Sequence, residues 1–156
     1  MKNVLKFSVL TLGVISMVGC GAKEDYSVKC TMESNDVINN YSTSSIYEII
    51  TDGEIVKKVK TTETVISENE TFLDLMEEQL SQNYEKMDES YGGYTTNISK
   101  NGNKVVSEVE IDYEHMDVES LLEDQPSMKN YANDNNQLTL EGVKTIYKAM
   151  GATCEE

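Results

Sequence analysis

The sequence predicts an α+β domain in which two main helices pack on one face of an antiparallel sheet of about five strands. Segments that alternate apolar and polar residues predict strands. Two dipeptides, Asp52-Gly53 and Asn101-Gly102, predict tight hairpin turns between such segments. Two further segments place apolar residues three or four positions apart, which is typical of amphipathic helices. Because strand pairs and helices occupy separate parts of the chain, we expect an antiparallel sheet with the helices on one side.

The N-terminal strand is expected from Tyr26 to Glu33. Its even-numbered residues are mostly apolar and its odd-numbered residues are polar, which is the pattern of a half-buried strand. The next segment, from Asp36 to Ser45, is largely polar and predicts a loop. The first strand is therefore expected to be separated in sequence from the two hairpins that follow it.

Two hairpins account for the other strands. The first joins residues 46–51 to residues 55–65 through Asp52-Gly53, both of which tolerate the positive φ of a tight turn. The second spans residues 94–113 around Asn101-Gly102, and its return strand has the clearest alternation in the chain. Together with the N-terminal strand, these segments make the expected sheet.

The main helices lie between and after the hairpins. One helix is expected at residues 71–87, with Thr71 as its N-cap. Its apolar stripe consists of Leu73, Met76, Leu80, Tyr84 and Met87. The last helix is expected from Thr139 to Met150 with Gly151 as its C-cap, and these residues are expected to face inward: Leu140, Val143, Ile146, Tyr147 and Met150. A short helical turn is expected at residues 117–122.

The N-terminus has the pattern of a bacterial lipoprotein signal peptide, predicted at residues 1–19. Two lysines precede an apolar run from Phe7 to Val18, which at about a dozen residues is shorter than the roughly 20 that span a bilayer as a helix. Gly19 and Cys20 then close the segment, so cleavage would leave Cys20 as the first residue, with a lipid on its thiol. Residues 20–25 form the lipidated cysteine and a short tether, and residues 26–156 form a single α+β domain.

The charge of the chain excludes some partners. Removing residues 1–19 takes away two of the 13 basic residues and none of the 28 acidic ones, which leaves a formal net charge of −17. Nucleic-acid binders show a basic footprint, so no nucleic-acid partner is expected. Membrane contact is expected only through the lipid on Cys20, while cationic partners and divalent ions stay open. All basic residues are lysine, which indicates an AT-rich, Gram-positive source. The lipid would then lie in the outer leaflet of the cytoplasmic membrane, while in a diderm the outer membrane stays open.

Two cysteines are left once Cys20 is lipidated. Outside the membrane, Cys30 and Cys154 are candidates for a disulfide that would tie the two ends of the domain together. The alternative is a pair of free thiols, one of them sensitive to redox state. A structural bridge is favoured, because neither cysteine lies in a Cys-x-x-Cys motif or near a histidine in sequence.

No motif in the sequence predicts catalysis or a cofactor. His115 is the only histidine, and a zinc site would need further nitrogen or sulfur ligands, so we expect a surface histidine. Residues 133–136 lack the glycine and glutamate spacing of a calcium loop and predict a polar turn. The tyrosines 91 and 94 beside Gly92-Gly93 leave a binding platform as a further hypothesis. The chain is expected not to be an enzyme, with no catalytic, cofactor-binding or metal-ligating residues.

The order of these segments resembles the YehR-like family of small bacterial lipoproteins. The resemblance covers most of the mature chain and includes residues 47–64, the helix ending near Tyr84, Gly92-Gly93, residues 109–113, the turn at 117–121, and the last helix leading into Met150-Gly151-Ala152. The cysteine pair is a departure from the enterobacterial members. The resemblance implies a family of unknown function without established catalytic residues, so no site residue is carried over.

Together these patterns predict a membrane-anchored, extracytoplasmic lipoprotein. It is expected to act as a non-catalytic accessory or binding module, with an envelope protein as a possible partner. The alternative is a cation-responsive or thiol-redox envelope protein that uses Cys30 and Cys154.

Overall fold

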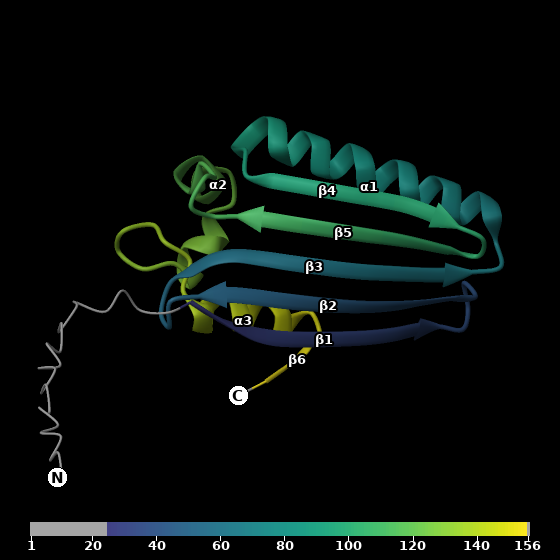
Figure 1. The fold of residues 1–156 in the computed structure, drawn as a ribbon, viewed down its shortest axis with the longest axis horizontal. Coiled ribbons are helices and arrows are strands. Elements are labelled where there is room, and N and C mark those ends of the chain that lie inside the picture. Colours follow the sequence, from purple (N-terminus) through teal and green to yellow (C-terminus); the bar gives the residue numbers. More distant parts are fainter. Residues whose placement is uncertain (1–24, 156) are drawn as a thin grey trace, which may run out of the picture.

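The computed structural model describes residues 25–155, which form a six-stranded antiparallel sheet with helices on one face (Figure 1). Along the chain the elements are β1 (Tyr26–Asp36), β2 (Tyr41–Thr51), β3 (Val56–Ser67), α1 (Glu70–Tyr91), β4 (Tyr94–Asn101), β5 (Lys104–Asp112), α2 (Val118–Asp124), the 3-10 helix η1 (Pro126–Tyr131), α3 (Leu140–Ala149) and β6 (Thr153–Cys154). The strand order is β4-β5-β3-β2-β1-β6. The predicted α+β class is confirmed, and the sixth strand is a two-residue segment that the sequence pattern did not indicate.

The chain forms a hairpin where the sequence predicted a loop. β1 and β2 pair without interruption from Tyr26 opposite Thr51 to Asp36 opposite Tyr41, so the loop predicted from Asp36 to Ser45 is wrong. The turn is confined to residues 37–40, where Asp36 Oδ1 accepts hydrogen bonds from the backbone N–H groups of Ile38 (3.0 Å) and Asn39 (2.9 Å). Alternation was hidden because residues 42–45 are Ser or Thr on both faces of β2.

The two predicted hairpins are confirmed, with strands longer than expected at several ends. β2 and β3 are joined around Gly53, whose φ is 111°, and β4 and β5 are joined around Gly102, whose φ is 60°. β5 also pairs with β3, from Lys58 opposite Asp112 to Ile66 opposite Lys104. This pairing places the second hairpin directly beside the first in the sheet, although α1 separates the two hairpins in sequence.

The long helix α1 presents its predicted stripe to the sheet. Leu73 is fully buried, and the other stripe residues are partly buried. The N-cap is Asn69, whose Oδ1 accepts a hydrogen bond from the N–H of Phe72 at 3.1 Å, so the prediction of Thr71 as N-cap is wrong. Asn69 is the better cap because it directly follows the turn out of β3, and its short amide reaches the free N–H groups of the first helical turn.

The helix α3 is also close to its prediction, except at its end. The Oγ1 of Thr139 accepts a hydrogen bond from the N–H of Gly142 at 3.1 Å and caps the helix. Leu140 and Val143 are buried as predicted, whereas Met150 is 54% exposed, so its predicted inward position is wrong. Met150 is the C-cap, the position predicted for Gly151, and the chain turns through Gly151 (φ 102°) toward β6.

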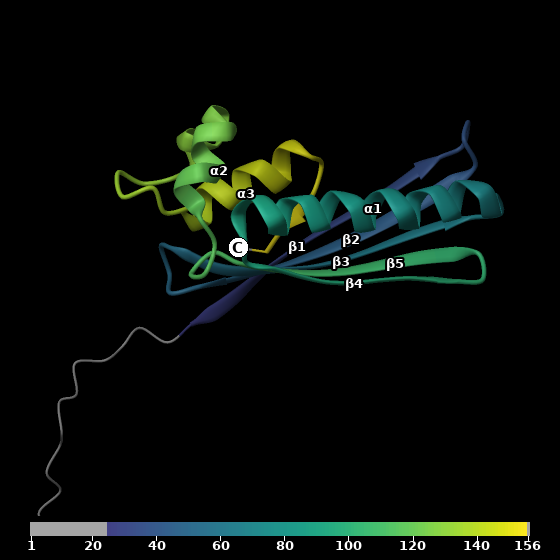
Figure 2. The same ribbon diagram turned by 90° about the horizontal axis from the view of Figure 1, so that it is seen from above.

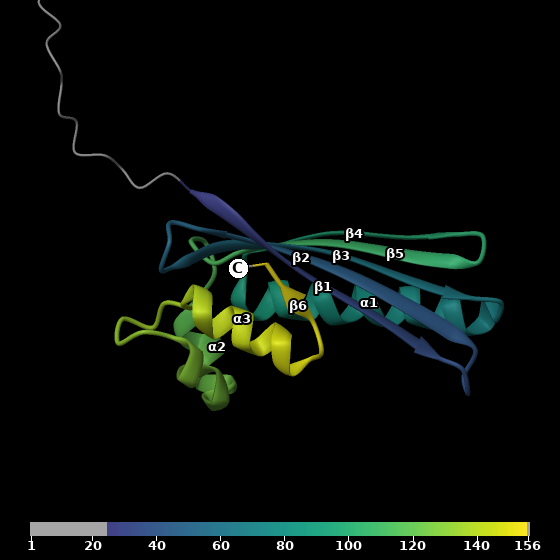
Figure 3. The ribbon, with the colours of Figure 1, turned by 90° about the horizontal axis from the view of Figure 1, so that it is seen from below.

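All helices cover the same face of the sheet, and the other face is open (Figures 2 and 3). Two apolar clusters lie beneath them. The larger contains residues of β1, β2 and β3 together with Leu122, Leu138, Leu140 and Val143, while the smaller is formed by Val65, Leu73 and Val105 beneath α1. Between the two clusters the covered face of the sheet is polar.

A single glycine decides how closely α3 approaches η1. A Cβ atom at Gly142 would lie 2.3 Å from the carbonyl oxygen of Tyr131 and 2.8 Å from its Cα, both of them backbone atoms. Alanine usually favours a helix over glycine by about 1 kcal/mol. Gly142→Ala is nevertheless expected to lower the free energy of unfolding by about 1–3 kcal/mol, the usual cost of overpacking. Urea denaturation measures this, with Lys148→Ala on the exposed side of α3 as control; an unchanged or raised stability would contradict it.

Candidate functional site

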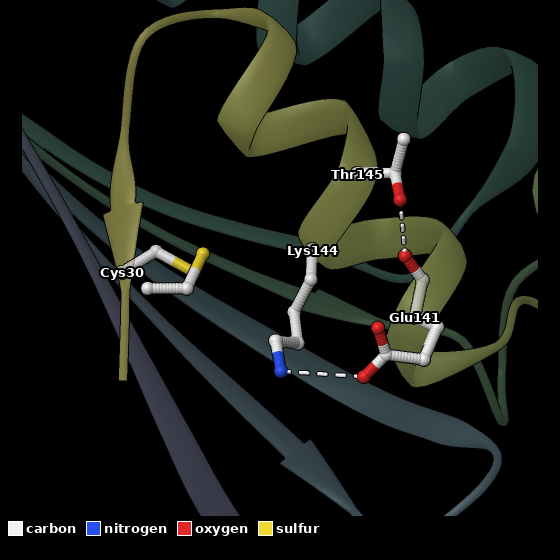
Figure 4. The surroundings of a disulfide bond; sticks show 5 residues. Cys30, Glu141, Lys144 and Thr145 are labelled. Atoms are coloured by element: carbon white, nitrogen blue, oxygen red, sulfur yellow. Dashed lines mark hydrogen bonds and ion pairs between the residues drawn. A yellow bond between two sulfur atoms is a disulfide. The ribbon is translucent and has the colours of Figure 1, made fainter. Parts of the chain in front are cut away.

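The cysteines of the described chain form a disulfide that joins the first strand to the last. Cys30 on β1 lies opposite Cys154 on β6, and the two sulfur atoms are 2.01 Å apart. Figure 4 shows α3 running beside this bridge, with Lys144 Nζ paired to Glu141 Oε1 at 3.2 Å along the helix. Cys30 is fully buried in the larger cluster. The predicted disulfide is confirmed.

The predicted anchor lies outside the described residues. This applies to the signal peptide at 1–19, to the lipidation site Cys20 and to residues 20–24 of the tether. Asp25, the last tether residue, is described, and its carboxylate pairs with Lys57 Nζ at 2.6 Å. This hydrogen bond raises the pKa of Lys57. The ion pair holds the entry of the chain beside β3.

His115 lies exposed at the end of β5, as expected for a surface histidine. Its side chain is 77% exposed, and its Nδ1 is 3.0 Å from Asp112 Oδ2. Asp112 also pairs with Lys58 Nζ at 2.7 Å, and this hydrogen bond lowers the pKa of the carboxyl group. Among residues 25–155, no group of three or more His, Cys, Asp or Glu side chains is arranged to hold a metal ion.

The glycine pair between Tyr91 and Tyr94 serves packing. A Cβ atom at Gly93 would lie 2.7 Å from the carbonyl oxygen of Asp112 and 3.0 Å from the Cβ of Met116. The bare backbone thus lets β4 approach the segment that follows β5, and it offers no opening for a ligand. Tyr91 Oη donates a hydrogen bond to Asp124 at 2.9 Å, and Tyr94 lies half-buried beside α1. The hypothesis of a tyrosine binding platform at this position is therefore not supported.

A pocket of about 410 Å³ lies at the end of the sheet where β1 begins and the β2–β3 turn is found. It lies within the range of roughly 300–1,000 Å³ that is typical of ligand sites. Its apolar lining is Ile55, Val56, Tyr113, Val118 and Leu138, and its polar lining is Asp52, Lys57, Glu114, Glu119, Asn135, Asn136 and Gln137. Val56 and Leu138 are buried, so the floor is apolar and the exposed rim is polar.

The loop that forms one wall of this pocket is held by its own hydrogen bonds. Asn133 Oδ1 accepts from the N–H groups of Asn135 (2.9 Å) and Gln137 (3.0 Å), which confirms the polar turn predicted at residues 133–136. The N–H of Val56 donates to the carbonyl oxygen of Leu138 at 2.9 Å and ties this loop to β3. This wall is thus anchored to the sheet, which favours a pocket with a defined shape.

The charges around the pocket favour a positively charged or hydrogen-bond-donating group. Three carboxylates, from Asp52, Glu114 and Glu119, line it together with one ammonium group, from Lys57. That ammonium is already paired with Asp25. Burial raises the pKa of Tyr113, which keeps its hydroxyl group neutral. Sequence reasoning missed this pocket, because its residues come from four separate segments and share no motif.

The described chain is thus an α+β domain, cross-linked between its first and last strands, with an acidic pocket at one end of its sheet. Its fold is YehR-like. The NMR structure of the YehR protein of E. coli matches it with a TM-score of 0.54 and 16% identity, over 86% of this chain and 93% of that chain. An NMR structure of a protein from Streptococcus pneumoniae TIGR4 matches with a TM-score of 0.48 and 13% identity, over 99% of this chain and 96% of that chain.

At these identities the likeness shows the fold alone, and at that level the predicted resemblance is confirmed. No model of a known protein family matches the chain, and no curated protein matches it. Within residues 25–155, none of the helices combines the length and the apolar character that a membrane span requires.

Proposed function

We propose that the chain is a lipid-anchored, extracytoplasmic binding module that acts without catalysis and accepts a basic group of an envelope protein in its acidic pocket. The observation that supports this most is the pocket itself, with an apolar floor and three carboxylates on its lining. Such a site suits a lysine or arginine side chain, whose apolar stem packs on the floor while its charged end meets the rim.

The disulfide and the position of Asp25 support the location. Disulfides persist in oxidising compartments outside the cytoplasm, which agrees with export by the signal peptide. Asp25 pairs with Lys57, and Lys57 lines the pocket. A tether from Cys20 to Asp25 spans less than about 20 Å even when extended, so the pocket would face the membrane-proximal zone.

A thiol-redox role for Cys30 and Cys154 has less support. Disulfide exchange needs a thiol to reach one of the sulfur atoms, and Cys30 is fully buried while Cys154 is partly buried. The cation-responsive alternative uses the same acidic surface, and it is distinguished from the proposed function by adding calcium to the experiment below.

Reversing one charge in the pocket is expected to weaken partner capture at least tenfold. Glu119→Lys places a second ammonium group on the rim and repels a basic group, and a loss of about 1.4 kcal/mol corresponds to tenfold weaker binding. Chemical crosslinking on intact cells, followed by purification in detergent and mass spectrometry, measures the enrichment of envelope proteins. We expect at least a tenfold loss of the enriched partner.

The matched control is Glu123→Lys, which lies on the same helix, is exposed and does not line the pocket. Cys20→Ala controls for protein that is not anchored. Equal capture by the Glu119→Lys and Glu123→Lys variants would overturn the proposal. Capture that appears only with added calcium would favour the cation-responsive alternative.

A further inference from the structure

A polar row crosses the helix-covered face of the sheet between the two apolar clusters. Ser45 of β2 lies opposite Glu63 of β3, and Glu63 lies opposite Ser107 of β5. These three residues share a face with Val65 of the smaller cluster and Val59 of the larger one, because side chains two positions apart on a strand point the same way. This polar row, defined as Ser45, Glu63 and Ser107, shares no residue with the lining of the acidic pocket.

The polar row has unused hydrogen-bonding capacity. Ser45 and Ser107 are each only 2% exposed, and the Oγ atoms of both have no hydrogen-bond partner. Glu63 is half-buried, and within residues 25–155 its carboxylate makes neither a hydrogen bond nor an ion pair. Folded proteins leave few buried polar groups unpaired. Two such hydroxyl groups on either side of one unpaired carboxylate therefore indicate a place built for an occupant.

No positive charge within the row offsets the negative charge of the Glu63 carboxylate. Burial raises the pKa of Glu63, because the charged form is partly removed from water. Burial is the main cause that raises the pKa of the Tyr84 phenol on α1, and the nearby charge of Glu63 also contributes. No lysine belongs to the row. A positively charged ligand would offset the negative charge of Glu63.

The number of ligands decides between a metal ion and an ammonium group. Adjacent strands are about 4.8 Å apart, so the Cβ atoms of Ser45 and Ser107 are separated by roughly 10 Å, and one ion beside Glu63 reaches only one of the two hydroxyl groups. A calcium ion takes about six to eight oxygen ligands, more than one carboxylate and one hydroxyl group supply. An ammonium nitrogen has three donors that reach about 2.9 Å, so it can bridge Glu63 and the hydroxyl group one strand away.

We infer that the polar row of Ser45, Glu63 and Ser107 is a binding site for a primary ammonium group. The group is either the ammonium ion itself or the amine of a small molecule, since both present the same charge and donors. Glu63 is not closed off from solvent, which gives a small amine access. The inference does not depend on the pocket or on its proposed partner.

The test is an NMR titration of the protein with ammonium, methylammonium and tetramethylammonium chloride at equal ionic strength. Ammonium is expected to produce saturable shifts of backbone amide signals in β2, β3 and β5. Tetramethylammonium has the same charge but no N–H donors, and it is expected to produce none. Saturation by methylammonium as well would assign the site to amines, whereas saturation by ammonium alone would assign it to the ion.

Two variants separate this site from general charge effects. Glu63→Gln keeps the shape of the side chain and is expected to weaken ammonium binding at least tenfold, since a hydrogen bond to a charged group contributes about 1.5–3 kcal/mol. Glu108→Gln removes an exposed carboxylate next to Ser107 in the chain and is expected to leave binding unchanged. Ammonium binding should also lower the pKa of Glu63 when its carboxyl signal is titrated.

An equal response to all three cations would overturn the inference, and so would unchanged binding in the Glu63→Gln variant. Since that substitution is isosteric, a circular dichroism spectrum identical to that of the parent protein ensures that a lost signal reports binding and not unfolding. Failure of this test would leave partner capture at the pocket unaffected, because the two sites share no residue.

Discussion

Removal of the Cys30–Cys154 disulfide is expected to lower the free energy of unfolding by about 4–5 kcal/mol. The bridge joins cysteines separated by 124 residues, so without it the unfolded chain gains nearly all the freedom of an open polymer. In the folded state, removal of the bridge also leaves β6 attached to β1 through only two residue pairs. Urea denaturation of a Cys30→Ser/Cys154→Ser double variant measures the loss.

A Cys20→Ala background serves as the reference, because it leaves only these two cysteines able to react. Reduction of this reference protein should reproduce the loss seen in the double variant. A difference below about 1 kcal/mol would contradict the prediction, since it would mean that the pairing of β6 and the packing of α3 restrain the C-terminus without the bridge.

Replacing both serines of the polar row by alanine is expected to stabilise the protein. Each buried hydroxyl group without a partner costs about 1–3 kcal/mol, so the Ser45→Ala/Ser107→Ala variant should gain about 2 kcal/mol or more in ligand-free buffer. Both side chains lie beside apolar clusters, and a methyl group fits the space of the hydroxymethyl group. Urea denaturation in a buffer free of ammonium and amines gives the measurement.

The control is Ser44→Ala, an exposed position on the open face of the same strand, where a change within about 0.5 kcal/mol is expected. If the double variant is less stable than the parent protein, water molecules already hydrogen-bond the two hydroxyl groups in ligand-free buffer, and the prediction fails. A gain in stability joined to a loss of ammonium binding would mean that the row costs stability in exchange for binding, as functional sites commonly do.

Local patterns predicted most of the elements correctly. The turns at Asp52-Gly53 and Asn101-Gly102 need a backbone conformation that few residues adopt, so the dipeptides alone locate them. The stripe on α1 is equally local, because residues three or four apart always share a helical face. The pairing of Cys30 with Cys154 followed from counting, since a lipidated Cys20 leaves only these two.

Other features depended on contacts between distant segments. The β1–β2 hairpin was missed because residues 42–45 show no apolar alternation, and their strand conformation comes from pairing with β1 on one side and β3 on the other. Met150 fits the helical period but lies outside, because α3 ends one residue earlier at Ala149. Single-residue differences at helix ends decide which side chains face the sheet.

The sequence by itself determined the class of fold, the order of its elements and the cysteine pairing, since these rest on short-range periodicity, turn chemistry and composition. Only the tertiary structure decided where chemistry is possible. Register across three strands brought Ser45, Glu63 and Ser107 into one row, and closure of distant loops formed the acidic pocket. The physical reason is that burial and cross-strand neighbours, which set the energy of a polar group, are properties of the packed chain and are not carried by any local motif.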